Sequence, residues 1–168
     1  SDVLSFLGYP GVFLFSFLDR LTVFLIPAEI VLPVFGILIG QGRLEYWQVL
    51  IWTTIGSFFG NLILYLIFLK GGRSLLEKYG KYVLIFHHDL THLDRWFSKH
   101  GNKLILWAFL LPTSIRSLAP IIAGISKMDA YRFSAYSLLT SFPLNILYIY
   151  VGIETSNNFK TIIEYIKK

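Results

Sequence analysis

Two long stretches without a charged side chain constrain this chain more than any other feature of its sequence. They run from Tyr46 to Leu69 and from Phe133 to Ile153. A helix needs about 20 mostly apolar residues to cross the hydrocarbon core of a bilayer, and both stretches reach that length. We therefore predict two transmembrane helices.

The composition agrees with a protein that lies in a membrane. Hydrophobic residues make up 55% of the chain and charged residues only 15%, whereas a typical soluble domain is about 25% charged. A mean hydropathy of +0.61 leaves too little polar surface to cover a soluble globule. The net charge of +5 indicates anionic lipid headgroups or orienting basic loops rather than a nucleic acid partner. Because cysteine is absent, disulfides, thiol catalysis and thiolate metal sites are excluded.

Two further apolar stretches are interrupted by prolines, a glycine and a charge. Leu21 to Gly42 contains Pro27, Glu29, Pro33 and Gly36, and Leu104 to Ile125 contains Pro112, Arg116, Pro120 and Gly124. Proline removes a backbone donor and glycine adds flexibility, so we expect each stretch to break at these residues and turn back as a re-entrant helical hairpin. A shorter uncharged stretch, Val3 to Leu18, predicts a helix that ends at Asp19-Arg20 or continues along the membrane surface.

The segment between the two halves, from Lys70 to Lys103, is polar. Apolar residues recur in it at helical spacing, which predicts amphipathic helices resting on the membrane interface. Its basic residues outnumber its acids by seven to three, which favours the cytoplasmic side. In an inverted repeat the lysine-ended tail after Thr155 would then lie on the opposite side, so the two orientation cues conflict.

The order of elements repeats in the two halves. A broken apolar stretch, a polar turn, aromatic residues and a long span occur at about 19–69 and again at 104–154. One span separates the two hairpins, so the second enters from the opposite side of the membrane, and such inverted repeats are typical of transporters. We predict one all-α membrane domain over residues 1–168: an inverted repeat of two re-entrant hairpins, each followed by a transmembrane helix, with interfacial helices between the halves. The alternative to an inverted repeat is that the two proline-containing segments are similar only by chance.

Glu29 and Arg116 are charged residues inside apolar stretches, in corresponding regions of the two halves. A charge at the centre of a membrane helix costs about 2.5 to 3.5 kcal/mol on insertion scales, so its presence indicates function. If the hairpin tips meet, protonation of the carboxylate would free the guanidinium to hold an anion such as a phosphate. A structural ion pair, or a charge that reaches the interface, is the alternative. Asp19 and Arg20 are boundary charges unless the first hairpin folds back beside them and brings a second carboxylate to the cavity.

Gly56 and Gly60 form a G-x-x-x-G face on the first span, a spacing that lets helix backbones approach closely. The partner is either another helix of the same bundle or a second copy of the chain in a homo-oligomer. Asn61 and Asn145 are intramembrane amides that need partners, either across a helix interface or along a cavity.

The histidines of HHDLTH, residues 87–92, include His88 and His92, which are spaced for zinc. The segment lacks the catalytic glutamate of H-E-x-x-H and has no evident third ligand beyond Asp89. The sequence also lacks a nucleophile elbow, a P-loop and a dinucleotide fingerprint. We therefore expect no metal, no cofactor and no enzymatic activity.

The chain resembles the DedA family of integral membrane proteins, whose shared region is called the VTT or SNARE-associated domain. The resemblance runs from about Phe15 to Gly152 and is strongest in RSLAPIIAGISKMDAYRF, Arg116 to Phe133. The motif IPAE with the following Gly36, and the segment DRWFSKHG, Asp94 to Gly101, are similar to further family segments.

The resemblance implies two opposed re-entrant hairpins, essential acids and arginines, and envelope homeostasis that depends on the proton-motive force. It implies a flippase or scramblase of a phosphorylated lipid, undecaprenyl phosphate or a phospholipid, in a bacterial or archaeal cytoplasmic membrane, with membrane lipids and protons as partners. By motif position Glu29 and Asp19 are the acids and Arg116 is the second arginine. Leu110 stands where the family usually has the first arginine, and Arg20 is our candidate for the lost charge. The alternatives are a non-transporting scaffold or stability factor and a small-ion transporter.

Overall fold

The computed structural model describes residues 2–21, 28–79, 95, 99–100, 102–110 and 114–166. Its elements are all helices, and the described residues contain no strand. In chain order they are α1 (Asp2–Leu21), α2 (Ala28–Gly40), α3 (Tyr46–Tyr79), α5 (Asn102–Leu110), α6 (Ser114–Ile125) and α7 (Ala130–Ile166). This confirms the all-α class.

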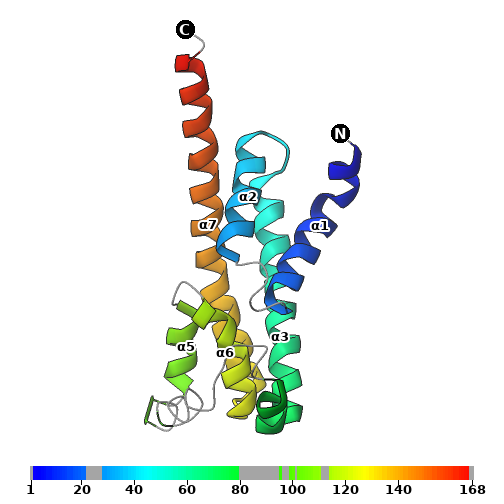
Figure 1. Ribbon diagram of the computed structural model, residues 1–168, viewed down its shortest axis with the longest axis vertical. Helices are drawn as coiled ribbons and strands as arrows, with labels where there is room; N and C mark the ends of the chain where they lie inside the picture. Colours follow the sequence, from blue (N-terminus) through cyan, green and yellow to red (C-terminus); the bar gives the residue numbers. More distant parts are fainter. Residues whose placement is uncertain are drawn as a thin grey trace.

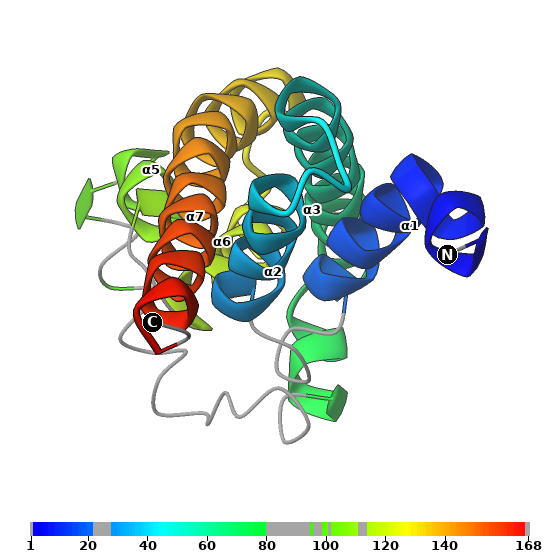
Figure 2. The same cartoon turned by 90° about the horizontal axis from the view of Figure 1, so that it is seen from above.

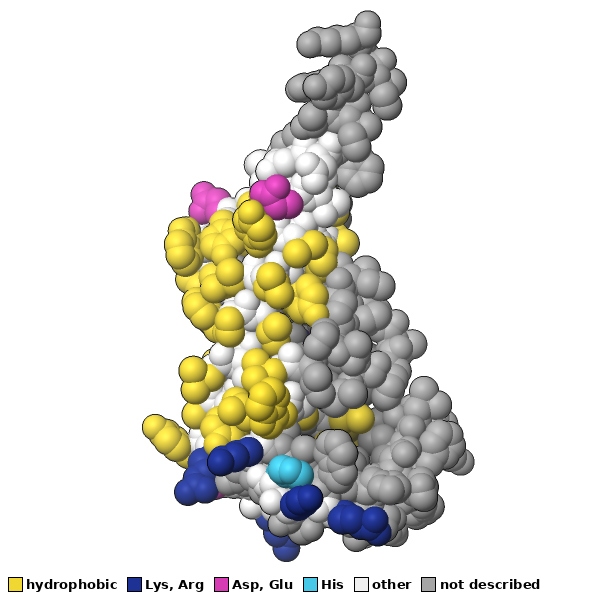
Figure 3. Space-filling model, turned by 90° about the vertical axis from the view of Figure 1, so that its left-hand side faces the viewer, with side chains coloured by type: hydrophobic (Ala, Val, Ile, Leu, Met, Phe, Trp, Pro, Cys, Tyr) yellow, Lys and Arg dark blue, Asp and Glu magenta, His cyan; other side chains and the backbone are white. Residues whose placement is uncertain are grey.

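The two long helices α3 and α7 run in opposite directions along the whole molecule (Figure 1). Their apolar parts, Tyr46–Gly72 and Ala130–Asn158, are long enough to cross a membrane and contain both predicted spans. Large apolar side chains remain exposed along them, for example Ile51 and Leu139, and they form a belt between charged ends on the face drawn in Figure 3. A broad exposed apolar surface of this kind is typical of a protein that faces lipid.

The first long helix changes direction where its apolar part ends. Gly72 has φ +54° and ψ −148°, a left-handed conformation that is readily available only to glycine. The residues after it, Arg73 to Tyr79, begin the polar segment that separates the two halves of the sequence. Gly72 therefore ends the first span and turns the chain away from its axis.

The short helices form two pairs at opposite ends of the long ones. α1 and α2 lie beside the upper half of α3 and α7, and α5 and α6 lie beside the lower half (Figures 1 and 2). We call them the upper pair and the lower pair. α2 runs upward from the middle of the molecule and α6 runs downward from the middle, so both inner helices begin near the same level (Figure 1).

The predicted break points are wrong at four residues. α2 is continuous through Pro33 and Gly36, and α6 is continuous through Pro120 and Gly124. A proline within the first two turns of a helix removes one hydrogen bond, and the remaining turns hold the helix together. Pro27 and Pro112 lie outside the described residues, as does HHDLTH.

The extent predicted for the first hairpin is also wrong. We expected the chain to turn back within Leu21 to Gly42, but the described residues of that range after Leu21 form one helix, α2, and the turn that follows it. The other limb of the upper pair is α1, which includes the stretch Val3 to Leu18 and continues through Asp19 and Arg20. The second expected hairpin, Leu104 to Ile125, includes most of α5 and all of α6.

Close backbone contacts join the inner helices to the long helices. Gly36 of α2 lies against Ile149 and Gly152 of α7, and a Cβ atom at Gly36 would overlap the backbone of α7. Gly124 of α6 lies against α3, where an added Cβ would be 2.6 Å from the Tyr65 carbonyl oxygen. Thus α2 packs mainly on α7 and α6 packs mainly on α3, so each inner helix is attached to the span of the other half.

The buried apolar residues form two main clusters, one beneath each pair. The lower cluster centres on Tyr65, Phe109 and Phe133, and the Tyr65 and Phe133 rings stack with centroids 4.4 Å apart. The upper cluster centres on Val49, Leu50 and Ile149. The polar residues described below lie between these clusters.

Candidate functional site

Asp19 and Arg20 form a buried ion pair in the last turn of α1. The Arg20 Nε atom lies 3.6 Å from Asp19 Oδ2, and the side chains are 3% and 7% exposed, respectively. Removing both charges from water is costly, and at membrane depth such pairs are expected at functional positions. Asp19 and Arg20 are thus buried at the end of α1 and not exposed at its boundary, and their role in a cavity stays a prediction.

A small pocket opens beside this ion pair. It is lined by side chains of three helices: Ser16, Asp19 and Arg20 of α1, Val31 and Leu32 of α2, and Ser57 of α3. Ser16 is 3% exposed, and its hydroxyl oxygen has no hydrogen-bond partner among the described residues. The pocket has no room for a water molecule, so the unsatisfied hydroxyl beside the charged pair gives it hydrogen-bonding capacity but no space for a ligand group in this conformation.

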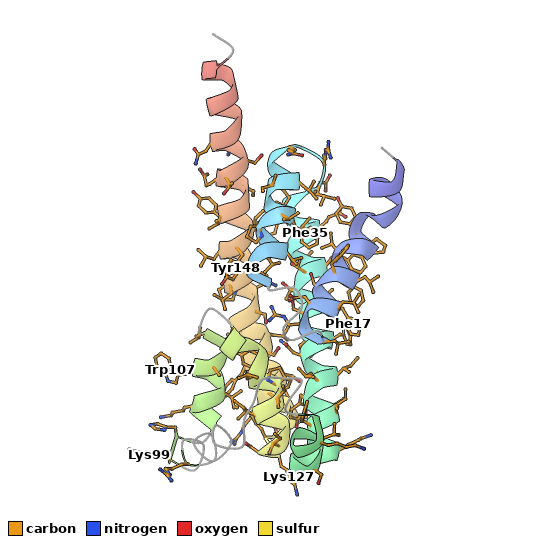
Figure 4. The ribbon with its side chains drawn as sticks, viewed as in Figure 1. Phe17, Phe35, Lys99, Trp107, Lys127 and Tyr148 are labelled. Atoms are coloured by element: carbon orange, nitrogen blue, oxygen red, sulfur yellow. The ribbon has the colours of Figure 1, made fainter. Side chains whose placement is uncertain are left out.

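The glycines of α3 hold the ion pair against that helix. A Cβ atom at Gly60 would lie 2.6 Å from the Arg20 Cβ, and one at Gly56 would lie 2.6 Å from the Phe13 carbonyl oxygen. The G-x-x-x-G face therefore packs on α1 of the same chain, which decides between the two partners that the sequence left open. Figure 4 shows Phe17 on the part of α1 between these contacts.

A buried seam of polar residues joins α3 to α7 next to the pocket. The Asn61 side-chain amide donates to Ser137 Oγ at 3.0 Å, and the Asn145 amide donates to Thr54 Oγ1 at 3.2 Å. Each amide thus bonds a hydroxyl on the other long helix. Ser57 connects the seam to the pocket, because it lines the pocket and precedes Asn61 by one helical turn.

The sequence interpretation found the two amides but missed the hydroxyl partners. The segments SFFGN at 57–61 and SFPLN at 141–145 repeat serine, phenylalanine and asparagine at the same spacing, but the bonded hydroxyls, Ser137 and Thr54, lie outside this repeat. Ser141 Oγ and Asn145 Oδ1 are buried and have no partner among the described residues. The seam therefore keeps unused hydrogen-bonding capacity in the interior.

Glu29 and Arg116 lie in the first turns of the two inner helices. Glu29 is the second residue of α2 and Arg116 is the third residue of α6, and both helices begin near the middle of the molecule (Figure 1). Their side chains are outside the described part of the structure, so the expected pairing of the two charges stays a prediction. Leu110, in place of the family arginine, is 43% exposed at the end of α5.

Each of these charged positions is followed four residues later by a proline, Pro33 or Pro120. A proline has no backbone N–H, so the carbonyl groups of residues 29 and 116 lose the donor that a regular helix provides. The same backbone feature therefore occurs in the first turn of both inner helices. Free carbonyl groups at membrane depth are tolerated where they are buried in protein or line a wet cavity.

These features define an integral membrane protein. The structure is all-helical, it has two apolar spans and a lipid-facing belt, and it buries a charge pair at mid-depth. The model of the VTT domain family matches residues 26–154. The chain therefore belongs to the VTT-domain family of bacterial plasma-membrane proteins, to which DedA also belongs.

Individual relatives agree with this assignment. The chain is 36% identical to the uncharacterized membrane protein YkoX of Bacillus subtilis over 93% of this chain and 68% of YkoX. It is 32% identical to undecaprenyl phosphate transporter A of Bacillus subtilis over 95% of this chain and 79% of that protein. Protein DedA of Escherichia coli is 34% identical over 38% of this chain and 28% of DedA. No solved structure matches the chain.

Proposed function

We propose that this protein moves a phosphorylated lipid across the membrane, as a flippase or scramblase driven by the proton-motive force. The observation that carries the proposal is the buried Asp19–Arg20 pair in a pocket at the end of α1. Undecaprenyl phosphate is the first substrate to test, because a relative that matches 95% of the chain is named as its transporter. A phospholipid is the second.

The helix arrangement supports a transport mechanism. The two halves of the chain make equivalent helix contacts. In the first half α1 packs on α3 and α2 packs on α7; in the second half α5 packs on α7 and α6 packs on α3. We infer that the halves form an inverted repeat and that the upper and lower pairs are re-entrant hairpins. Inverted repeats place the substrate site near the midplane and open it to the two sides in turn.

The starts of the inner helices suit an anionic headgroup. The N-termini of α2 and α6 both lie near mid-depth, and a helix N-terminus offers backbone N–H groups and a partial positive charge. Arg20 in the pocket and Arg116 in the first turn of α6 would add guanidinium groups, which bind phosphate in a bidentate manner. The apolar belt beside them would keep the isoprenoid or acyl chain in lipid.

Proton coupling follows from the ion pair. While Asp19 is ionised it neutralises Arg20, and a proton on the carboxylate would leave the guanidinium available for phosphate. Release of the phosphate on the other side would restore the pair and expel the proton. Glu29, in the first turn of α2, is the second carboxylate that we assign to this exchange.

Transport by purified protein in liposomes tests the proposal. The substrate is a fluorescent polyprenyl phosphate, and a matched experiment uses a fluorescent phospholipid with and without a pH gradient. We expect Asp19→Asn to slow translocation by roughly tenfold or more, the factor that corresponds to 1.4 kcal/mol. Glu45→Gln is the matched control, because Glu45 is exposed at the upper end. A wild-type protein that moves neither lipid would favour the scaffold alternative.

A further inference from the structure

Exposed basic side chains gather at the lower end of the molecule. This basic end comprises Lys70, Lys78, Arg95, Lys99, Lys103, Lys127 and Arg132. Among the described exposed residues there, Asp129 is the one acid. The space-filling view shows lysine and arginine side chains directly below the apolar belt on one face (Figure 3), and Figure 4 labels Lys99 and Lys127 at this end.

The opposite boundary of the apolar belt has a different charge. Its described exposed charges are Arg43, Glu45 and Glu154, one base against two acids. On the face drawn in Figure 3, acidic side chains border the belt above and basic side chains border it below. The described exposed charges are therefore polarised along the direction in which the protein crosses the membrane.

The basic end is assembled from segments that are far apart in the sequence. Lys70 and Lys78 come from the end of α3, Lys103 from the start of α5, and Lys127 from the turn between α6 and α7. Only the antiparallel course of the long helices and the placement of the lower pair bring them to one level (Figure 1).

Lys127 has a backbone conformation that residues other than glycine rarely adopt. It has φ +51°, a left-handed conformation that favours glycine, and it directly follows the end of α6. The Lys127 N–H donates to Gly124 and the Met128 N–H donates to Ala123, both at 3.0 Å, which completes the helix end. The Lys127 side chain is exposed, so this turn adds a positive charge to the basic end.

We propose that the basic end binds the anionic phospholipid headgroups of the cytoplasmic leaflet. Lysine and arginine beside the apolar belt lie at the depth of the headgroups, where each adds to the attraction toward an anionic leaflet. The excess of basic residues also assigns this end to the cytoplasm. The proposal chooses the basic segment over the lysine-ended tail as the orientation cue, and it does not depend on the transported substrate.

Lipid binding is tested with purified protein in detergent, titrated with phosphatidylglycerol or with phosphatidylcholine while the melting temperature is measured. We expect a larger rise with phosphatidylglycerol, because a ligand that binds only the folded state stabilises it, and loss of the difference at high salt. The variant with Lys99, Lys103, Lys127 and Arg132 all changed to Gln should lose most of that preference. Equal rises with both lipids, or a full preference in this variant, would refute the proposal.

Two variants control for effects other than headgroup binding. Arg43→Gln removes an exposed base at the opposite end and should leave the phosphatidylglycerol preference unchanged. A variant with Lys99, Lys103 and Lys127 changed to Arg keeps the charge and should also retain it. Loss of the preference in either control would indicate that the fold, not the basic end, determines lipid binding.

Orientation is tested in intact cells with single cysteines, because the chain has none of its own. Glu45→Cys lies at the upper end and Lys127→Cys at the basic end. A membrane-impermeant maleimide should label the cysteine at position 45 from outside and reach position 127 only after the cells are opened. The reverse pattern would overturn the assignment whether or not the protein transports lipid.

Discussion

Asn61 on α3 donates a hydrogen bond to Ser137 on α7, a residue 76 positions later in the chain, with a donor–acceptor distance of 3.0 Å. The reciprocal bond, from Asn145 on α7 to Thr54 on α3, has a distance of 3.2 Å. Because the two helices are antiparallel, these bonds bracket Ser57 and Ser141 at the same level. The long helices are thus joined by polar contacts at the depth where the charged pocket lies.

Replacing Asn61 or Asn145 should weaken the packing of α3 against α7. Interhelical hydrogen bonds in membrane proteins contribute about 0.6 kcal/mol on average and up to about 1.7. We expect Asn61→Leu and Asn145→Leu each to lower the free energy of unfolding by an amount in this range, measured by denaturation in detergent. Thr140→Val is the control, because the Thr140 hydroxyl bonds carbonyls of its own helix. An unchanged stability in both leucine variants would contradict the role of the seam.

The contact between Gly36 and Gly152 has no room for a methyl group. An added Cβ at either glycine would overlap the backbone of the facing helix, so Gly36→Ala and Gly152→Ala must push α2 away from α7. Overpacking typically costs about 1 to 3 kcal/mol, and we expect a loss of that size in thermal unfolding. Val34→Ala is the control within α2, since Val34 is 46% exposed. Equal stability of the glycine variants and the control would argue against close packing here.

Arg20 should be as important for transport as Arg116. If Arg20 supplies the charge lost at Leu110, then Arg20→Ala and Arg116→Ala should reduce lipid translocation to a similar degree, and Arg20→Lys should keep part of it. Removing one partner of a buried pair costs about 3 to 5 kcal/mol, so the rate must be normalised to folded protein. Normal transport by Arg20→Ala would remove this residue from the mechanism.

A double variant separates stability from function at the same pair. Asp19→Asn combined with Arg20→Gln removes both charges of this pair together, so we expect it to be more stable than either single variant. It should remain inactive in the liposome assay, because neither a titrating carboxylate nor a guanidinium is left. Recovery of transport together with stability would show that the pair is only structural.

The prolines after Glu29 and Arg116 allow a test of the free carbonyl groups. Pro33→Ala and Pro120→Ala restore a backbone donor inside α2 and α6, and we expect each to raise the free energy of unfolding by up to about 3 kcal/mol. If the free carbonyls serve the transported headgroup or its protons, the same variants should transport more slowly than wild type. Higher stability with unchanged transport would assign the prolines to folding alone.

Much of the architecture could be predicted because hydrophobicity is local. An uncharged stretch such as Tyr46 to Leu69 must lie in the membrane wherever the rest of the chain goes, and a proline four residues after Arg116 identifies an unusual helix start. The limits of the upper pair could not be predicted in this way. Pro33 and Gly36 were predicted as breaks, whereas α2 continues through both and packs at Gly36 against α7.

The sequence by itself determined that this protein lies in a membrane and where its two spans run. It also determined the family and which few charges interrupt the apolar stretches. The tertiary structure alone decided that Asp19 and Arg20 are buried together, that Gly60 lies under Arg20, and that the scattered lysines share one end. The physical reason is that hydrophobic burial is set by each segment's own composition. Charge pairing, close glycine contacts and surface potential depend instead on which distant segments meet.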